Sequence, residues 1–255
     1  MEYPAGPLTG ERSLPKNLNT QVAIIDYGMG NLFSIKQACE YVGLTPVITS
    51  DKQDIEGSRA LILPGVGAFG DAMDTLHRLD LVSVILDVAN SNKPLLGICL
   101  GMQLLMSESP EFGLHSGLGI IEGEVAPLQT SAAEGPRALK VPQVGWNRIH
   151  APSWKQEQKG YGETVELGEN LEPHWNSTLF HGLTDGEYMY FVHSFFVQPS
   201  DADVVVSTTQ YGTNRFCSSL RRQNVFGCQF HPERSGLKGL HIYRNLARLL
   251  APEAV

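Results

Sequence analysis

The feature that most constrains the fold is an alternation of short apolar runs with longer stretches of helical periodicity between residues 22 and 98. The apolar runs are VAIID, TPVIT, ALILP and PLLGI, and the helical stretches between them include Leu32–Val42 and Asp71–Ala89. Apolar runs without polar alternation are typical of parallel strands buried on both faces. The pattern therefore predicts a doubly wound, mostly parallel α/β sheet flanked by helices, with its chemistry on loops at the carboxyl ends of the strands.

The second half of the chain has a different pattern. After Gly117 come strand-like pieces interrupted by Gly and Pro, namely GLGIIEGEV, YMYFVHSFFV, DVVVSTTQY and FCSSLRRQNVFGCQFHPE. These pieces predict additional antiparallel strands. An apolar stripe through Leu237–Leu250, made of Leu240, Ile242, Leu246, Leu249 and Leu250, predicts a helix that closes the domain.

The chain of 255 residues has the size of one α/β domain, which we expect to span residues 21–252. Residues 1–20 are polar, contain three prolines and lack the apolar core of a secretory signal, so we expect a mobile N-terminal tail. A polar segment rich in Gly, Glu, Lys and Gln, at about 150–175, predicts a surface insertion.

Composition excludes several functional classes. A net charge of -8 without clusters of Lys and Arg argues against nucleic acid or an anionic membrane as partner. The longest apolar run, 94–106, is shorter than the roughly 20 residues of a membrane-spanning helix. The four cysteines are widely spaced and form no C-x-x-C pair, which argues against a zinc site or a disulfide framework and favours a reducing, cytoplasmic compartment.

The strand PLLGI leads directly into Gly97-Ile98-Cys99-Leu100-Gly101, which has the form of a nucleophile elbow with cysteine in place of serine. A sharp strand-to-helix turn strains the backbone of the nucleophile, and glycines beside it avoid steric clashes. The helix N-terminus would stabilise a thiolate at Cys99. An inert buried thiol is the structural alternative for a cysteine at such a position.

A thiolate nucleophile needs a base that can also protonate a departing amine, and histidine suits both roles near neutral pH. His231 follows the apolar run VFGCQF, is fixed by Pro232, and has Glu233 two residues further on. Residues two apart in extended chain point the same way, so Glu233 can accept the Nδ1 proton of His231 and leave Nε2 facing the sulfur. We therefore predict a triad of Cys99, His231 and Glu233.

An acyl-transfer site also needs donors for the oxyanion. The glycine-rich run Pro64–Gly70 follows ALIL, and its backbone N–H groups could approach a substrate carbonyl, although a tight turn alone would also favour these glycines. Gly28-Met29-Gly30 after VAIID lacks the third glycine of a dinucleotide-binding loop, so we do not expect a nucleotide cofactor.

The motifs DYGMGN, PGVGAFGDAM, GICLGMQLL, YFVHSFFV and QFHPERS occur in that order and together resemble the class I glutamine amidotransferases, a flavodoxin-like fold family. Among them the chain is most similar to the glutaminase subunits of imidazole glycerol phosphate synthases, from Val22 to Leu250. The resemblance implies hydrolysis of glutamine by Cys99, His231 and Glu233 without metal or cofactor. The implied substrate-binding residues are Gly65, Val66, Gly67, Gln103, His193, Ser194 and Phe195. For His193, a purely structural hydrogen-bonding role is the alternative.

The resemblance also implies a heterodimer with a separate cyclase subunit, a (β/α)₈ barrel that uses the ammonia in histidine biosynthesis. The run KVPQVGWN resembles the synthase-facing strand of the family, which usually has His at the position of Gln143. The implied contacts with the partner are Asn31, Pro142, Trp146, Asn147 and Arg234.

The sequence is also compatible with three other functions. Similar subunits feed ammonia to amidotransferases that act on N-acetylated sugars for surface polysaccharides, and the same triad could serve a stand-alone hydrolase. A scaffold that retains the fold without activity is the non-enzymatic alternative.

Overall fold

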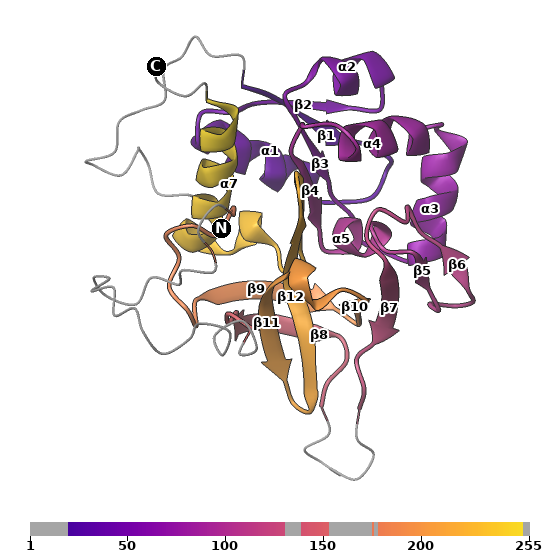
Figure 1. The fold of residues 1–255 in the computed structure, drawn as a ribbon, viewed down its shortest axis with the longest axis vertical. Coiled ribbons are helices and arrows are strands. Elements are labelled where there is room, and N and C mark those ends of the chain that lie inside the picture. Colours follow the sequence, from indigo (N-terminus) through magenta and orange to yellow (C-terminus); the bar gives the residue numbers. More distant parts are fainter. Residues whose placement is uncertain (1–19, 131–138, 153–174, 176–177, 252–255) are drawn as a thin grey trace.

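A computed structural model describes residues 20–130, 139–152, 175 and 178–251 of the chain, which form the mixed sheet and surrounding helices of Figure 1. The predicted N-terminal tail, except Thr20, and most of the predicted insertion lie outside the described residues. No helix among the described residues is long and apolar enough to span a membrane.

Five parallel strands form one half of the main sheet. In spatial order they are β2 (Thr45–Thr49), β1 (Gln21–Ile25), β3 (Ala60–Leu63), β4 (Leu95–Ile98) and β13 (Val225–Cys228). This order, with the first two strands exchanged, is the flavodoxin-like one, in which ligands bind beyond the carboxyl ends of the strands. The predicted doubly wound fold is confirmed.

Helices cover both faces of the parallel strands, which the alternation of side chains along β1 requires. Val22 and Ile24 pack into a core beneath α1 (Leu32–Tyr41) and α7 (Gly236–Leu250). Ala23 and Ile25 point into a second core on the other face. That face is covered by α2 (Lys52–Gly57), α3 (Phe69–Arg78), α4 (Val82–Ala89) and α5 (Leu100–Leu104).

The expectation of one helix over Asp71–Ala89 was wrong, because the structure divides this stretch into α3 and α4. The break falls at Asp80, which has a φ of 55°, a left-handed conformation that a continuous α-helix cannot contain. α3 also begins two residues earlier than predicted, at Phe69. Apolar periodicity alone does not report such a break.

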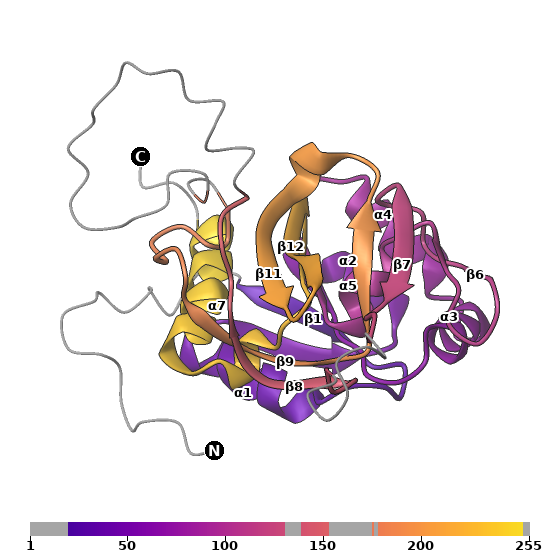
Figure 2. The ribbon, with the colours of Figure 1, turned by 90° about the horizontal axis from the view of Figure 1, so that it is seen from below.

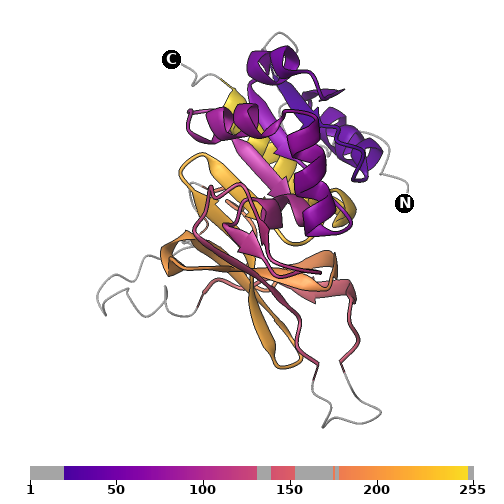
Figure 3. The same ribbon diagram turned by 90° about the vertical axis from the view of Figure 1, so that its right-hand side faces the viewer.

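Antiparallel strands extend the sheet beyond β13 and lie below the helix-covered half in Figure 3. They follow in the order β12 (Asn214–Arg222), β10 (Phe195–Pro199), β7 (Gly123–Pro127), β5 (Glu108–Ser109) and β6 (His115–Ser116), and β11 (Val205–Tyr211) pairs with β12. β5 and β7 alone run parallel to each other here. Short 3-10 helices span Ala202–Val204 and Pro232–Arg234. The predicted antiparallel character is confirmed for β7, β10, β11 and β12. It was wrong for the end of FCSSLRRQNVFGCQFHPE, because β13 turns back from β12 and joins β4 in parallel.

Two predicted strands differ in detail. Of GLGIIEGEV, the structure forms a strand only from Gly123 onward, and the short strands β5 and β6 were not predicted. The run YMYFVHSFFV is divided at Ser194 into two strands of different sheets. Its first part, β9 (Tyr188–His193), pairs with β8 (Gln143–Arg148), and the two lie side by side beneath the main sheet in Figure 2.

The flanks of the predicted insertion pack onto the domain. His150 forms an isolated β-bridge with Thr208, and the fully buried Trp175 donates a hydrogen bond from Nε1 to the carbonyl oxygen of Val206 at 2.9 Å. The ends of the polar segment are therefore part of the core region. In α7, Leu249 faces outward instead of contributing to the predicted apolar stripe.

Candidate active site

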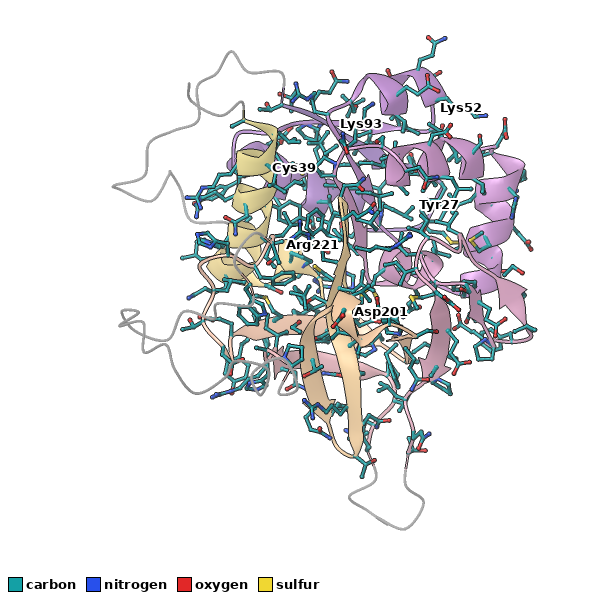
Figure 4. All side chains as sticks on the ribbon, viewed as in Figure 1. Tyr27, Cys39, Lys52, Lys93, Asp201 and Arg221 are labelled. Atoms are coloured by element: carbon teal, nitrogen blue, oxygen red, sulfur yellow. The ribbon has the colours of Figure 1, made fainter. Side chains whose placement is uncertain are left out.

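A cavity of about 270 Å³ lies at the carboxyl ends of the parallel strands. Most of its lining residues follow β1, β3, β4 and β13 or belong to the crossing between β9 and β10; Glu111 comes from the segment between β5 and β6, and Pro142 precedes β8. Figure 4 gives the orientation, because Tyr27 marks the carboxyl end of β1, whereas Lys93 marks the opposite, amino end of β4. The cavity thus occupies the position where open α/β sheets bind ligands.

Cys99 stands at the turn from β4 into α5 with a φ of 54° and ψ of -111°, a conformation that is strained for a residue other than glycine. Its backbone N–H donates to the carbonyl oxygen of Cys228 at 2.7 Å, which holds the turn against β13. A Cβ at Gly101 would collide with the carbonyl oxygen of Leu63, and one at Gly97 would lie 2.8 Å from the carbonyl oxygen of Gly101. The flanking glycines therefore allow α5 to start directly beneath the cysteine.

His231 and Glu233 follow β13 and are both buried. Nδ1 of His231 donates to Oε1 of Glu233 at 2.8 Å, and the imidazole is hydrogen-bonded to the sulfur of Cys99. The backbone N–H of His231 donates to the carbonyl oxygen of Tyr190 at 2.9 Å, which fixes this segment to β9. The structure thus brings together the three residues predicted as a triad, with Glu233 behind His231 and outside the cavity lining.

The protonation of His231 follows from its two neighbours. Burial by itself lowers the pKa of His231, but the charge and hydrogen bond of Cys99, together with those of Glu233, raise this pKa to about 10. An imidazole whose pKa is raised keeps its proton at neutral pH, so His231 can act as a proton donor beside the sulfur of Cys99.

The predicted oxyanion loop lies beside Cys99, with Val66 and Gly67 in the cavity wall and Gly65 buried behind them. Within the described residues, the backbone N–H groups of Val66 and Gly67 donate to no other group. Tyr27 Oη donates to the carbonyl oxygen of Pro64 at 2.7 Å and thereby fixes the start of the loop. Burial, followed by the charge of Cys99, raises the pKa of Tyr27, so its hydroxyl remains a donor.

Gln103 and the crossing segment from His193 to Phe195 also line the cavity, as the resemblance implied. Nδ1 of His193 lies 2.8 Å from the carbonyl oxygen of Phe195, and its Nε2 lies 3.1 Å from Oε1 of Gln143. Burial lowers the pKa of His193 to about 4, so the ring is neutral and donates to Phe195. A neutral ring has one N–H, so the amide of Gln143 must present its NH₂ group to Nε2. These hydrogen bonds are also compatible with the other role considered for His193, that of a purely structural residue.

Three lining residues were absent from the sequence prediction: Leu100, Glu111 and Val192. Glu111 is the one with chemical significance, because it brings a carboxylate to the cavity. Its Oε2 accepts a hydrogen bond from the backbone N–H of Phe69 at 2.7 Å, at the N-terminus of α3. No sequence signal identified it, since its position depends on the irregular segment between β5 and β6.

The predicted partner-contacting residues divide into two groups. Asn31, Pro142 and Arg234 line the cavity, and the guanidinium of Arg234 lies over the ring of Tyr190 at 4.6 Å. Trp146 and Asn147 lie outside it on β8. Trp146 is 51% exposed and its ring makes an edge contact with Tyr190, with 5.9 Å between centroids. Within the described residues, no group of three His, Cys, Asp or Glu side chains is arranged to hold a metal ion.

This combination of an open α/β sheet, a cysteine elbow and a His-Glu pair defines a class of protein. Residues 23–248 match the glutamine amidotransferase class-I family, and the chain belongs to that family.

The relatives within this class are more specific. The chain is 41% identical over 229 residues to the imidazole glycerol phosphate synthase subunit HisH of Moorella thermoacetica, covering 90% of this chain and 95% of the relative. It is 43% identical over 224 residues to HisH of Syntrophotalea carbinolica, with coverage of 88% and 98%. HisH of Aquifex aeolicus is 42% identical over 229 residues, with coverage of 89% and 96%. These relatives are subunits of a synthase, which implies a partner subunit.

Solved structures support the fold independently. PurLQS from Thermotoga maritima aligns with a TM-score of 0.61 at 21% identity, covering 92% of this chain and all of that chain. The crystal structure of a glutamine amidotransferase aligns with a TM-score of 0.62 at 17% identity, with coverage of 90% and 98%. At these identities the likeness establishes the architecture alone.

Proposed function

We propose that this chain is the glutaminase subunit of an imidazole glycerol phosphate synthase, which hydrolyses glutamine and passes the ammonia to a cyclase subunit for histidine biosynthesis. The observation that carries the proposal is the hydrogen-bonded set of Cys99, His231 and Glu233 at a cavity, in a chain about 40% identical to HisH subunits over most of its length.

In the first half of the reaction, the Cys99 thiolate attacks the side-chain carboxamide carbon of glutamine. The backbone N–H groups of Val66 and Gly67 are available to stabilise the oxyanion that develops on the carboxamide oxygen. The C–N bond then breaks, and the imidazolium of His231 gives its proton to the departing nitrogen. This leaves ammonia, a γ-glutamyl thioester on Cys99 and a neutral His231.

In the second half, His231 acts as a base. It takes a proton from water as the water oxygen attacks the thioester carbon, and the C–S bond breaks to give glutamate and restore the thiolate. Glu233 keeps Nδ1 of His231 protonated throughout, so that Nε2 is the atom that exchanges protons.

The cavity has charges suited to an amino acid. Glu111 brings a carboxylate to the lining, which is opposite in charge to the α-ammonium group of glutamine. Arg234 brings a guanidinium, which is opposite in charge to the α-carboxylate. Gln103, Ser194 and Phe195 line the same cavity and would orient the side chain of the substrate.

The ammonia needs a second active site. Ammonia released into water is protonated and loses its nucleophilicity, so the site that consumes it must adjoin this cavity, and the HisH relatives are subunits of a synthase. We place that site on a separate (β/α)₈ cyclase bound over the cavity mouth and β8. All four cysteines are free, which suits a cytoplasmic location.

Coexpression with the cyclase encoded in the same genome tests this proposal. The purified complex should form imidazole glycerol phosphate from the cyclase substrate with glutamine as nitrogen donor, and Cys99→Ala should abolish the reaction with glutamine while leaving that with added ammonium intact. A complex that instead aminates an N-acetylated sugar, or a chain that releases glutamate at full rate alone, would contradict the assignment.

A further inference from the structure

Gln229 is a buried polar residue to which the mechanism above gives no role. It lies between β13 and His231 and is fully buried. Its Nε2 lies 3.7 Å from the sulfur of Cys99, within the distance of an N–H···S hydrogen bond, and its Oε1 lies 3.2 Å from Nε2 of Gln103. It therefore connects a predicted substrate-binding residue to the nucleophile.

The orientation of the Gln229 amide follows from its neighbours. Nε2 of Gln103 lies 2.9 Å from the carbonyl oxygen of Phe195, which can only accept a hydrogen bond, so the NH₂ group of Gln103 must be on that side. The same NH₂ group also faces Gln229, which must then present its oxygen. The NH₂ group of Gln229 is left pointing at the sulfur. No alternative assignment satisfies all three contacts.

The sulfur of Cys99 has a donor on one side and an acceptor on another. A protonated thiol can donate to the carbonyl oxygen of Val192, at 3.6 Å. A thiolate cannot make that bond, but it accepts from Gln229 and from His231. A hydrogen bond made to the charged form of a group favours that form, and the NH₂ group of Gln229 is placed to make such a bond with a thiolate.

We propose that Gln229 is a further catalytic residue, whose amide N–H stabilises the Cys99 thiolate and links it through Gln103 to the substrate cavity. The inference rests on the proposed function only in taking Cys99 as the nucleophile. Within the described residues Oε1 of Gln103 accepts no hydrogen bond, and Gln103 lines the cavity, so a substrate N–H can donate there. That bond would polarise both amides in series and strengthen the donor at the sulfur.

The ionisable groups that act on the sulfur are His231, after β13, and Tyr27, after β1. Glu233 acts through His231, His193 lies near His231 and is neutral, and Glu111 and Arg234 stand elsewhere in the cavity lining. A substitution at Gln229 changes none of these residues. In an uncharged variant of Gln229, the alkylation of Cys99 therefore reports on the loss of the Gln229 donor.

The test is the pH dependence of alkylation of Cys99 by iodoacetamide, followed by peptide mass spectrometry on the full chain without glutamine. Gln229→Met keeps the length of the side chain and removes the donor, and should raise the alkylation midpoint by about one pH unit, a tenfold loss of rate below it. Gln229→Glu keeps the acceptor for Gln103 and should raise the midpoint at least as far.

Two controls separate the possible outcomes. Gln198→Met changes an exposed glutamine of β10 and should leave the midpoint in place. Gln103→Met should weaken glutamine binding, seen as a raised KM in the complex, with a smaller effect on the midpoint. Unchanged midpoints in both Gln229 variants would overturn the inference, while the dependence of glutamine hydrolysis on Cys99 would still stand. A wild-type complex without glutamine-dependent activity would instead contradict the proposed function.

Discussion

The acid–base behaviour of the site depends on one buried hydrogen bond, from Nδ1 of His231 to Oε1 of Glu233. Glu233→Gln would keep an oxygen in place for this bond but remove the charge that helps to hold the pKa of His231 high. We predict that kcat for glutamine hydrolysis in the complex falls roughly 100-fold, since general acid–base catalysis is worth about 10² to 10⁴.

The matched control is Glu124→Gln, which changes an exposed carboxylate on β7. It should leave kcat unaltered. If Glu233→Gln behaved like this control, Glu233 would have no part in orienting His231.

A second prediction at this scale concerns His193, whose pKa burial lowers to about 4. Between pH 6.5 and 4, the imidazole of His193 is protonated in the unfolded chain but neutral in the folded chain. Protons therefore favour the unfolded chain in this range, so the free energy of unfolding is highest above pH 6.5 and decreases as the pH falls toward 4. The loss is on the order of 3 kcal/mol. Urea unfolding of wild type and His193→Gln at pH 7 and at pH 4 measures it.

The wild type should lose more free energy of unfolding between the two pH values than the variant does. If the wild type and the variant lost equal amounts of unfolding free energy, the pKa of His193 would be the same in the folded and unfolded chains. The hydrogen bonds of His193 to Phe195 and Gln143 would then be arranged differently.

The residues of the site were predictable from sequence to different degrees. Cys99 and His231 stand in short motifs whose local geometry fixes their positions, and the spacing of Glu233 places it beside the imidazole. Glu111 and Gln229 had no such signal. Glu111 reaches the cavity from an irregular segment that contacts Phe69, and the importance of Gln229 depends on its distance from Gln103 and Cys99, which no local pattern encodes.

At the scale of elements, the elbow depends on close contact between α5 and β3. A methyl group at Gly101 would collide with the carbonyl oxygen of Leu63, so Gly101→Ala must separate the helix from the strand. We predict a loss of about 3 kcal/mol in unfolding free energy, the upper range for overpacking a core. Chemical denaturation of the isolated chain measures it.

Gly57→Ala supplies the control, because a Cβ at this position in α2 would meet no atom within 4 Å. It should be neutral or slightly stabilising, as Ala favours a helix over Gly. Equal stabilities of the two variants would contradict the close packing described for the elbow.

The elements themselves show where sequence patterns fail. Strands β1 to β4 were predictable as parallel because each is a continuous apolar run, and α7 because its stripe is long, whereas the run of β13 was grouped with the antiparallel pieces. The break between α3 and α4 depends on the left-handed conformation of Asp80. The division of YMYFVHSFFV into two strands depends on pairing, because β9 and β10 belong to different sheets. Both are decided by tertiary contacts that a local pattern does not contain.

At the scale of the whole molecule, the proposed transfer of ammonia requires a partner over the cavity mouth. Trp146 is 51% exposed on β8, and half-exposed tryptophans are typical anchors of interfaces. We predict that Trp146→Ala weakens binding of the cyclase by about 2 kcal/mol, or roughly 30-fold in Kd, as measured by titration calorimetry.

Leu249 is also 51% exposed but lies on α7, away from the cavity lining, so Leu249→Ala is the matched control. Its Kd should match that of the wild type. Equal weakening by both variants, or by neither, would place the interface elsewhere.

The measurement that tests the central claim most directly is labelling by an electrophilic analogue of glutamine, such as a diazoketone, followed by intact-mass and peptide mass spectrometry. We predict a single adduct on Cys99 that abolishes glutamine hydrolysis, is prevented by excess glutamine, and does not form in Cys99→Ala. The remaining cysteines do not line the cavity and should stay unmodified. Full activity after labelling, or an inactivating adduct on a residue other than Cys99, would contradict the assignment of Cys99 as the nucleophile.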